Sequence, residues 1–252
     1  MIEVKNIVKS FDGKKVLNDI SARFENGSTN LIIGQRGSGK TVLLKSILGL
    51  HEVDSGKIFY DDREFTKMNQ KARKIMRQEI GMVFQGGALF DSLTVEQNIR
   101  FPLDMFTFQS TKEKQQRVDF CLEHVNIKGA HKLFPSEISG GMQKRVAIAR
   151  AIALNPKYLF CDEPNSGLDP ETATRIDKLI QDITKEFKIT TIINTHDMNS
   201  VIEIGEMVLF INSGQKCWEG SKQNILKTDN SELNKFIFAN KLYAQFKQNN
   251  KG

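Results

Sequence analysis

The stretch Gly34-Gln35-Arg36-Gly37-Ser38-Gly39-Lys40-Thr41 follows the pattern G-x-x-x-x-G-K-T of a phosphate-binding loop. Its glycines let the main chain curl so that several N–H groups point at one anion. In this pattern Lys40 reaches the β- and γ-phosphates of a nucleotide, and the Thr41 hydroxyl is placed for Mg²⁺. The apolar residues 29–33 before the loop predict a buried strand, and the spacing of apolar residues over 41–50 predicts a helix. Strand, loop and helix therefore follow one another in the order that this motif requires.

Length and composition are those of one large α/β domain, or of a core with an inserted subdomain. The chain has 252 residues, of which 39% are hydrophobic and 26% charged, and its formal net charge is +6. This charge is compatible with nucleic acid or an anionic membrane surface, but no long block of like charge favours either partner. Three scattered cysteines without a C-x-x-C pair indicate neither a zinc site nor a disulfide framework. No signal sequence and no apolar run of roughly 18 residues is present, so we expect any transmembrane path to lie in another chain.

The residues that precede the loop predict a small antiparallel sheet. Residues 2–7 and 16–24 read as strands, and Asp12-Gly13 between them is a hairpin turn. Phe11 stands at the edge of this turn, where its ring could stack on an adenine or pack against the sheet.

Helical patterns replace strand patterns between residues 89 and 155, which predicts a helical insertion. Near its end, Ser139-Gly140-Gly141-Met142-Gln143 opens a helix for which Ser139 is a good N-cap. The exposed N–H groups at the start of that helix, together with two glycines, form a second candidate anion site.

Strands and helices alternate again after residue 155, which implies a parallel sheet. Gln85, Asp162, Glu163 and His196 each come just after a predicted strand, and such sheets bind ligands beyond the carboxyl ends of their strands. We therefore expect these four side chains to converge on the phosphate loop. Asp162 is the expected Mg²⁺ partner of Thr41, Glu163 can polarise a water for attack on the γ-phosphate, and Gln85 could touch both. His196 could hold the γ-phosphate or orient the water, although a turn carboxylate or a capping histidine would be an ordinary structural role for such residues.

Together these residues closely resemble the ATP-binding subunits of ABC transporters, and the resemblance spans almost the whole chain. The Ser139-Gly140-Gly141 signature separates this family from other phosphate-loop ATPases. A phosphate-loop kinase would have no reason for that signature or for Asp162-Glu163. An ABC protein that acts on DNA or ribosomes usually carries two ATPase halves or a long coiled-coil insertion, and the sequence has neither.

The resemblance implies an α/β phosphate-loop NTPase fold: a RecA-like core with a mostly parallel sheet, an antiparallel β-subdomain and an inserted ABC helical subdomain. Residues 1–252 then form a single nucleotide-binding domain. The core and β-subdomain take residues 1–85 and 156–229, the helical subdomain residues 86–155, and a tail helix residues 230–252. We expect the tail to pack through an apolar stripe formed by Leu233, Phe236, Ile237, Tyr243 and Phe246.

The resemblance also implies the ligands, which are ATP and Mg²⁺. Glu163, His196 and Gln85 are then catalytic, and Thr41, Gln85 and Asp162 hold the metal. The residues expected at the nucleotide are Phe11, Gly34, Gln35, Arg36, Gly37, Ser38, Gly39, Lys40, Thr41, Val42, Ser139, Gly140, Gly141, Gln143 and Asp169.

The implied assembly is a head-to-tail homodimer at the cytoplasmic face of the inner (plasma) membrane, with no nucleic-acid partner. ATP on the phosphate loop of one subunit is capped by Ser139-Gly140-Gly141 of the other. An integral membrane permease is the expected partner. Leu89, Phe90 and Leu93 are its expected contacts, although they could instead be internal packing.

A finer resemblance lies in residues 84–95, FQGGALFDSLTV, which look like the Mla-type ATPases that serve lipid transport with a permease and an MCE-domain protein. Residues 161–170 and 195–201 point the same way. We therefore expect phospholipid as cargo and an MCE-domain protein as a further partner, with an amino acid, a metal or a drug as alternatives. Arg36 departs from the family, which usually has a small polar residue there. It could add a phosphate contact, face Asp169 of the opposing subunit, or crowd the loop.

Overall fold

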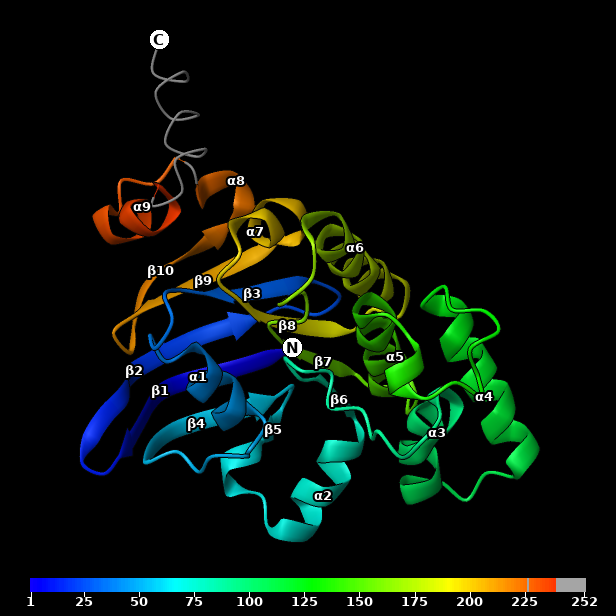
Figure 1. Ribbon diagram of the computed structural model, residues 1–252. Coiled ribbons are helices and arrows are strands. Elements are labelled where there is room, and N and C mark those ends of the chain that lie inside the picture. Colours follow the sequence, from blue (N-terminus) through cyan, green and yellow to red (C-terminus); the bar gives the residue numbers. More distant parts are fainter. Residues whose placement is uncertain (226, 239–252) are drawn as a thin grey trace. The chain divides into compact units, whose positions relative to one another are not determined.

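β1 (Ile2–Phe11) and β2 (Lys14–Phe24) form the antiparallel hairpin that opens the chain in the computed structural model, which describes residues 1–225 and 227–238. Asp12 and Gly13 make the turn with φ of 49° and 76°, the left-handed values that a two-residue hairpin turn requires. β4 (Ser55–Tyr60) and β5 (Arg63–Glu64) complete a four-stranded sheet in the order β2-β1-β4-β5 (Figure 1). The antiparallel sheet expected from the sequence is therefore present.

The chain divides into two compact units, which are described separately below. The first contains residues 1–25, 29–67 and those from 194 on, and the second contains residues 26–28 and 68–193. These limits differ from the predicted subdomain boundaries, because the strands and helix between residues 68 and 85 cluster with the helices that follow them. The division into a core and a helical subdomain at residues 85 and 155 stays a prediction.

In the first unit, β3 (Thr29–Ile33) carries the phosphate loop at its carboxyl end. It pairs in parallel with β9 (Met207–Asn212), and β9 pairs antiparallel with β10 (Gln215–Ser221). All five residues of β3 are buried, including the polar Thr29 and Asn30, as expected for an inner strand. The helices of this unit are α1 (Lys40–Ile47), the 3₁₀ turn η1 (Phe65–Lys67), α7 (Met198–Ile204), α8 (Lys222–Ile225) and α9 (Ser231–Phe238).

α9 covers about the first third of the predicted tail helix, residues 230–252. Leu233 and Ile237 are buried, and the ring centroid of Phe236 lies 5.4 Å from that of Phe210 in β9. The apolar stripe of α9 thus packs on the first unit. Tyr243 and Phe246, the other two residues of the predicted stripe, lie outside the described residues.

In the second unit, three strands run in the order β8-β7-β6, and β6 pairs in parallel with β7. They are β6 (Ile80–Val83), β7 (Tyr158–Asp162) and β8 (Thr190–Thr195), of which Asn194 and Thr195 belong to the first unit. The helices are α2 (Gln70–Gln78), α3 (Val95–Phe106), α4 (Thr111–His124), the 3₁₀ turn η2 (Pro135–Glu137), α5 (Gly140–Ile152) and α6 (Pro170–Glu186). None of the helices in the described ranges has the length and apolar character needed to cross a membrane.

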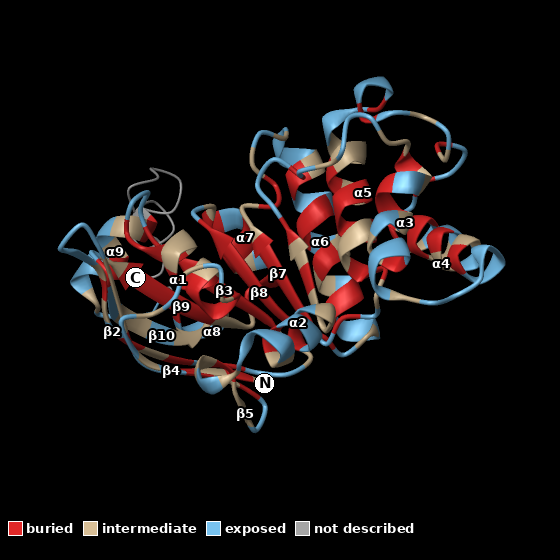
Figure 2. Cartoon of the chain, turned by 90° about the horizontal axis from the view of Figure 1, so that it is seen from below, coloured by how far each residue is buried: buried red, intermediate tan, exposed pale blue. Residues whose placement is uncertain are grey.

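α5 is the central helix of the second unit and packs against α3, α4, α6 and β6. Its residues 146–149 are all buried, so the helix is covered on more than one side, and Figure 2 shows red along α5 and the adjoining α6. Alanine at two of these four positions lets the neighbouring elements approach closely. The helix that starts at Ser139-Gly140-Gly141 is therefore fixed by the core of its unit.

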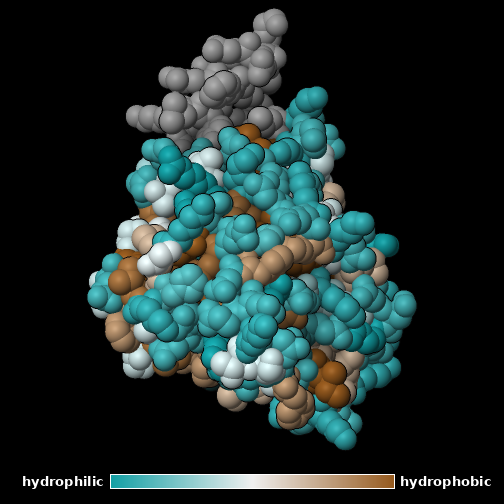
Figure 3. Space-filling model, turned by 90° about the vertical axis from the view of Figure 1, so that its right-hand side faces the viewer, coloured by the Kyte–Doolittle hydropathy of each residue, from teal (hydrophilic) through white to brown (hydrophobic). Residues whose placement is uncertain are grey.

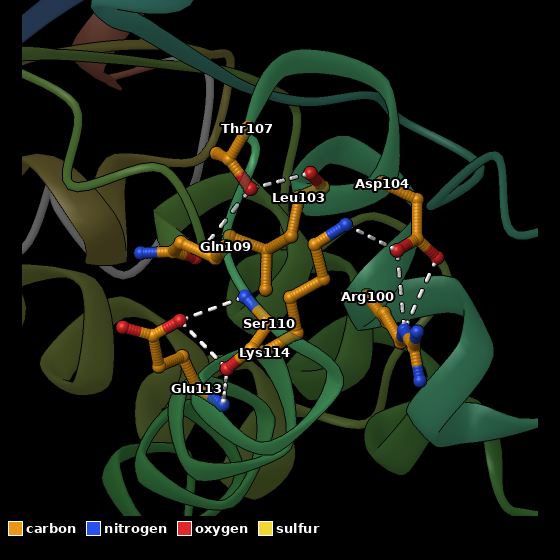
Figure 4. Close-up of polar contacts among 8 residues, drawn as sticks. All are labelled: Arg100, Leu103, Asp104, Thr107, Gln109, Ser110, Glu113 and Lys114. Carbon is orange, nitrogen blue, oxygen red and sulfur yellow. Dashed lines mark hydrogen bonds and ion pairs between the residues drawn. The ribbon is translucent and has the colours of Figure 1, made fainter.

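The corner between α3 and α4 is fixed by polar contacts (Figure 4). The Asp104 carboxylate accepts from Arg100 Nε at 3.2 Å and from Lys114 Nζ at 2.9 Å, and Lys114 is only 9% exposed. Ser110 and Glu113 form a capping box at the start of α4, which satisfies two N–H groups at the helix end. This corner holds a buried lysine whose charge is paired within the corner itself.

Candidate active site

The phosphate loop joins β3 to α1 through three glycines in the left-handed region of φ. Gly34, Gly37 and Gly39 have φ of 152°, 78° and 106°, and Gly39 is the N-cap of α1. A Cβ on Gly34 would lie 2.2 Å from the carbonyl oxygen of Ile211 and 2.7 Å from Ser38 Oγ, so only glycine fits there. The loop is therefore a tight cradle at the N-terminus of a helix, where backbone N–H groups and the helix dipole favour an anion.

The polar groups of the cradle fit a phosphate chain. Lys40 is buried, and its Nζ donates to the carbonyl oxygens of Gly34 at 2.9 Å and Gln35 at 3.0 Å, which holds the ammonium inside the loop. Ser38 Oγ is buried and makes no hydrogen bond within the part of the chain that the structure describes. The Thr41 hydroxyl accepts from Asn194 Nδ2 at 3.0 Å, which orients this side chain in the first turn of α1. An orphaned hydroxyl, a buried ammonium and an oriented threonine are the groups that a nucleotide phosphate with Mg²⁺ would satisfy.

Asn194 is a functional position that the sequence reading missed. It is fully buried near the end of β8, and its contact with Thr41 ties the carboxyl end of that strand to the first turn of α1. A polar residue inside the apolar run 190–195 was the available signal, because buried amides are retained where they find partners. His196 follows two residues later and is exposed between β8 and α7.

The remaining predicted residues of the first unit lie at its surface. Phe11 is 39% exposed at the end of β1, where its ring packs edge-on against His51 with centroids 5.2 Å apart. The ring thus packs against a neighbour and still presents surface to solvent. Val42 is half-buried in the first turn of α1, and Arg36 is exposed with no hydrogen bond or ion pair to the other described residues. The three roles considered for Arg36 therefore all stay open.

In the second unit, Gln85 and Glu163 lie side by side. Gln85 Nε2 donates to Glu163 Oε2 at 3.2 Å and approaches Ser166 Oγ at 3.5 Å. Gln85 follows β6, and Glu163 comes directly after Asp162, the last residue of β7. Glu163 has φ of 45°, an unusual left-handed conformation for a residue with a side chain, which is typical of functional turns. Of the four side chains expected to converge on the phosphate loop, the structure thus brings Gln85 and Glu163 into contact with each other.

Lys144 adds a cation to this pair, and the sequence reading missed it. It lies in the second turn of α5, is 7% exposed, and donates from Nζ to the carbonyl oxygen of Gln85. Burial lowers the pKa of Lys144, and the negative charge of Glu163 opposes that change. In the sequence Lys144 follows a polar helix start, as a solvent-exposed lysine would. No local pattern therefore indicated that it is buried beside Gln85.

The second candidate anion site is the start of α5. Ser139 is its N-cap and accepts from the Met142 N–H at 3.3 Å, as predicted. A Cβ on Gly141 would lie 2.8 Å from Thr172 Cγ2, so this glycine permits close packing on α6. Gln143 is engaged with its own main chain, since Nε2 donates to the carbonyl oxygens of Pro135 at 2.9 Å and Ile138 at 3.4 Å.

Asp169 is the N-cap of α6 and accepts from the Thr172 N–H at 3.0 Å. The hydrogen bonds from Thr172 hold the pKa of the exposed Asp169 carboxyl below its usual value, so it is ionised at neutral pH. The second unit thus presents a carboxylate–amide pair, a buried ammonium and two capped helix starts.

Comparisons with known proteins identify the family of this chain. A family model described as "ABC transporter" matches residues 17–166. The methionine import ATP-binding protein MetN of Clostridioides difficile (strain 630) is 39% identical over 237 residues, which cover 94% of this chain and 74% of that protein. The probable ribonucleotide transport ATP-binding protein mkl of Mycobacterium leprae (strain TN) is 34% identical over 236 residues, which cover 94% and 68%. Among solved structures, the dimeric post-hydrolysis ATP-binding cassette MJ0796 bound to ADP and Pi has a TM-score of 0.80 and 29% identity, and the match covers 88% of this chain and 99% of that one.

The names of these relatives do not support the expected cargo. Their names describe the transport of methionine and of a ribonucleotide, and they give the predicted phospholipid cargo and MCE-domain partner no support. The lipid prediction rested on short loop segments, whereas the match to the methionine importer extends over almost the whole chain.

Proposed function

This chain belongs to the ABC transporter family as an ATP-binding subunit with ATPase activity, and we propose that it drives the import of an amino acid, with methionine as the first candidate. One observation carries the choice of cargo, which is the 39% identity to a methionine import subunit over 94% of the chain. The amino-acid alternative is therefore preferred over the lipid expectation.

For ATP hydrolysis we propose the residue roles that the family resemblance implies. The phosphate loop binds the ATP triphosphate through main-chain N–H groups, Lys40 and Ser38. A water then attacks the γ-phosphorus of the ATP. Glu163 accepts the proton of that water as general base, the bond to the β-phosphate oxygen breaks, and ADP and phosphate leave. His196 and Gln85 orient the water and the γ-phosphate. Mg²⁺, held by Thr41, Asp162 and Gln85, would neutralise charge on the phosphates.

The assembly that suits this chemistry is a head-to-tail homodimer. The phosphate loop of one copy would face the start of α5 in the other, so that Ser139, Gly140 and Gly141 cap the bound ATP. Ser139 and Gly140 are exposed in the structure, as such a role requires. The MJ0796 cassette, a structural relative, is described as a dimer.

The permease contact is proposed at the loop between β6 and α3. Phe90 is 42% exposed and its ring lies 4.7 Å from that of Phe101, which is also exposed, while Leu89 and Leu93 are half-buried. Figure 3 shows that brown apolar patches interrupt a mostly teal surface on one face of the molecule. Exposed aromatic residues that touch each other are typical of a protein-binding surface.

This loop is held rigidly by one buried side chain. Asn98 Nδ2 donates to the carbonyl oxygens of Phe90, Leu93 and Thr94 at 3.0–3.1 Å, and its Oδ1 accepts from the Phe90 N–H at 2.9 Å. A preorganised loop loses little conformational entropy on binding, which favours a permanent partner such as a permease helix.

Uptake of labelled methionine in a strain that lacks the gene tests the cargo. We expect uptake to fall and to return with the wild-type gene but not with Glu163→Gln. Intact methionine uptake together with a changed distribution of phospholipid between membranes would overturn the amino-acid proposal and would leave the ATPase assignment standing.

A further inference from the structure

Lys144 joins three parts of the second unit that separate elements supply. Its ammonium lies on α5, the carbonyl it contacts belongs to Gln85 after β6, and the carboxylate whose charge it feels belongs to Glu163 after β7. Gln85 is thus held from both ends, because its side-chain amide bonds Glu163 at 3.2 Å while its main chain bonds Lys144.

Burial of the charged Lys144 ammonium is unfavourable unless nearby groups compensate for it. A lysine that is 7% exposed keeps its charge only where acceptors and an opposite charge compensate for lost hydration. The carbonyl of Gln85 and the carboxylate of Glu163 provide both. A change in the position of Gln85 or Glu163 relative to α5 therefore leaves a buried cation poorly compensated.

We infer that Lys144 is a positioning residue for ATP hydrolysis, whose ammonium ties the start of α5 to the main chain at Gln85 and holds that residue against Glu163. The inference rests on the proposed roles of Glu163 as base and of the α5 start as the cap of the partner's nucleotide. Under that assignment, closure of a second copy on α5 is transmitted through Lys144 to the residue that orients the attacking water. Lys144 itself touches neither the nucleotide nor the water.

Steady-state ATP hydrolysis by the purified full chain tests this role, with Lys144→Met as the main variant. Methionine has a similar length and no charge, so the core stays filled. We expect kcat to fall about tenfold, equivalent to about 1.4 kcal/mol in the barrier, while KM for ATP stays within about twofold. Lys144→Arg keeps the cation and an N–H donor, and we expect it to restore most of the rate.

Lys114→Met is the matched control. Lys114 is also a buried lysine of the second unit, 9% exposed, but its partner is Asp104 at the α3–α4 corner (Figure 4). We expect it to lower the melting temperature at least as much as Lys144→Met and to leave kcat unchanged. The double variant Gln85→Ala with Lys144→Met should be about as slow as the slower single variant, because Lys144 is proposed to act through the Gln85 side chain, which alanine removes.

Three results of these measurements would overturn the positioning role of Lys144. Equal kcat for Lys144→Met and the wild type, with Glu163→Gln slow, overturns the role of Lys144 alone. A fall in kcat that Lys114→Met reproduces also overturns it, since loss of stability then explains the effect. A Glu163→Gln variant as fast as the wild type overturns both the proposed base and the positioning role built on it.

Discussion

Replacing Gly34 by alanine tests whether the phosphate loop is shaped by close packing or only by backbone conformation. The added methyl would lie 2.2 Å from the carbonyl oxygen of Ile211, more than 1 Å inside the 3.4 Å at which ordinary contact begins. The φ of Gly34 is also 152°, where side chains are strained. Gly37 is the matched control, because its φ is 78° but a Cβ would meet nothing within 4 Å.

Gly34→Ala and Gly37→Ala differ in one contribution to the free energy of unfolding, which is overpacking. Gly37→Ala carries only backbone strain, about 1–2 kcal/mol. Gly34→Ala adds overpacking against the end of β9, typically about 1–3 kcal/mol, and the clash with main chain leaves no flexible group to give way. We expect Gly34→Ala to lower the free energy of unfolding by about 2 kcal/mol more than Gly37→Ala, equivalent to about 4–8 °C in melting temperature at this size.

Urea unfolding followed by the fluorescence of Trp218 measures this difference. It is the single tryptophan of the chain and lies in β10, in the same unit as the loop, so its signal reports on that unit. Equal destabilisation by the two substitutions would refute the packing argument, because backbone strain alone would then account for both.

Three further predictions concern the sites and the α3–α4 corner. Lys40→Ala should weaken ATP binding at least tenfold in a titration, and Glu163→Gln should keep binding but slow hydrolysis by about 10²-fold or more; equal hydrolysis by Glu163→Gln and the wild type would refute the base. Arg36→Ser separates the open roles of this residue: weaker ATP but unchanged ADP affinity indicates a phosphate contact, weaker ATP-dependent dimerisation alone indicates Asp169 of the partner, and tighter binding of both nucleotides indicates crowding. The pKa of Asp104 lies below 3.8 in the folded protein, where its burial is outweighed by hydrogen bonds from Lys114 and Arg100. The ionised Asp104 should therefore stabilise the fold fully above about pH 4, and this stabilisation should be lost as the pH falls through the lowered pKa of the folded state. Asp104→Asn should remove that part of the acid dependence of the melting temperature.

The choice of cargo depends on how much of the chain is compared. Residues 84–95 suggested a lipid-transport ATPase, yet the structure gives much of this stretch a local purpose, since Asn98 binds the main chain of Phe90, Leu93 and Thr94. Contacts that only hold the 84–95 loop in shape carry little information about the molecule that a separate permease moves. Similarity over the whole chain was the better guide to the cargo that we propose.

The sequence alone determined every feature whose cause lies within a few neighbouring residues. The phosphate loop, the Asp12-Gly13 turn and the Ser139 cap all depend on local φ values or on a side chain reaching an N–H three residues away, and all are present as predicted. Tertiary structure decided the contacts between distant residues. Asn194 meets Thr41 across 153 residues and Lys144 meets Gln85 across 59. No periodicity encodes such pairs, because a buried polar residue is compensated only by the partner that packing brings to it.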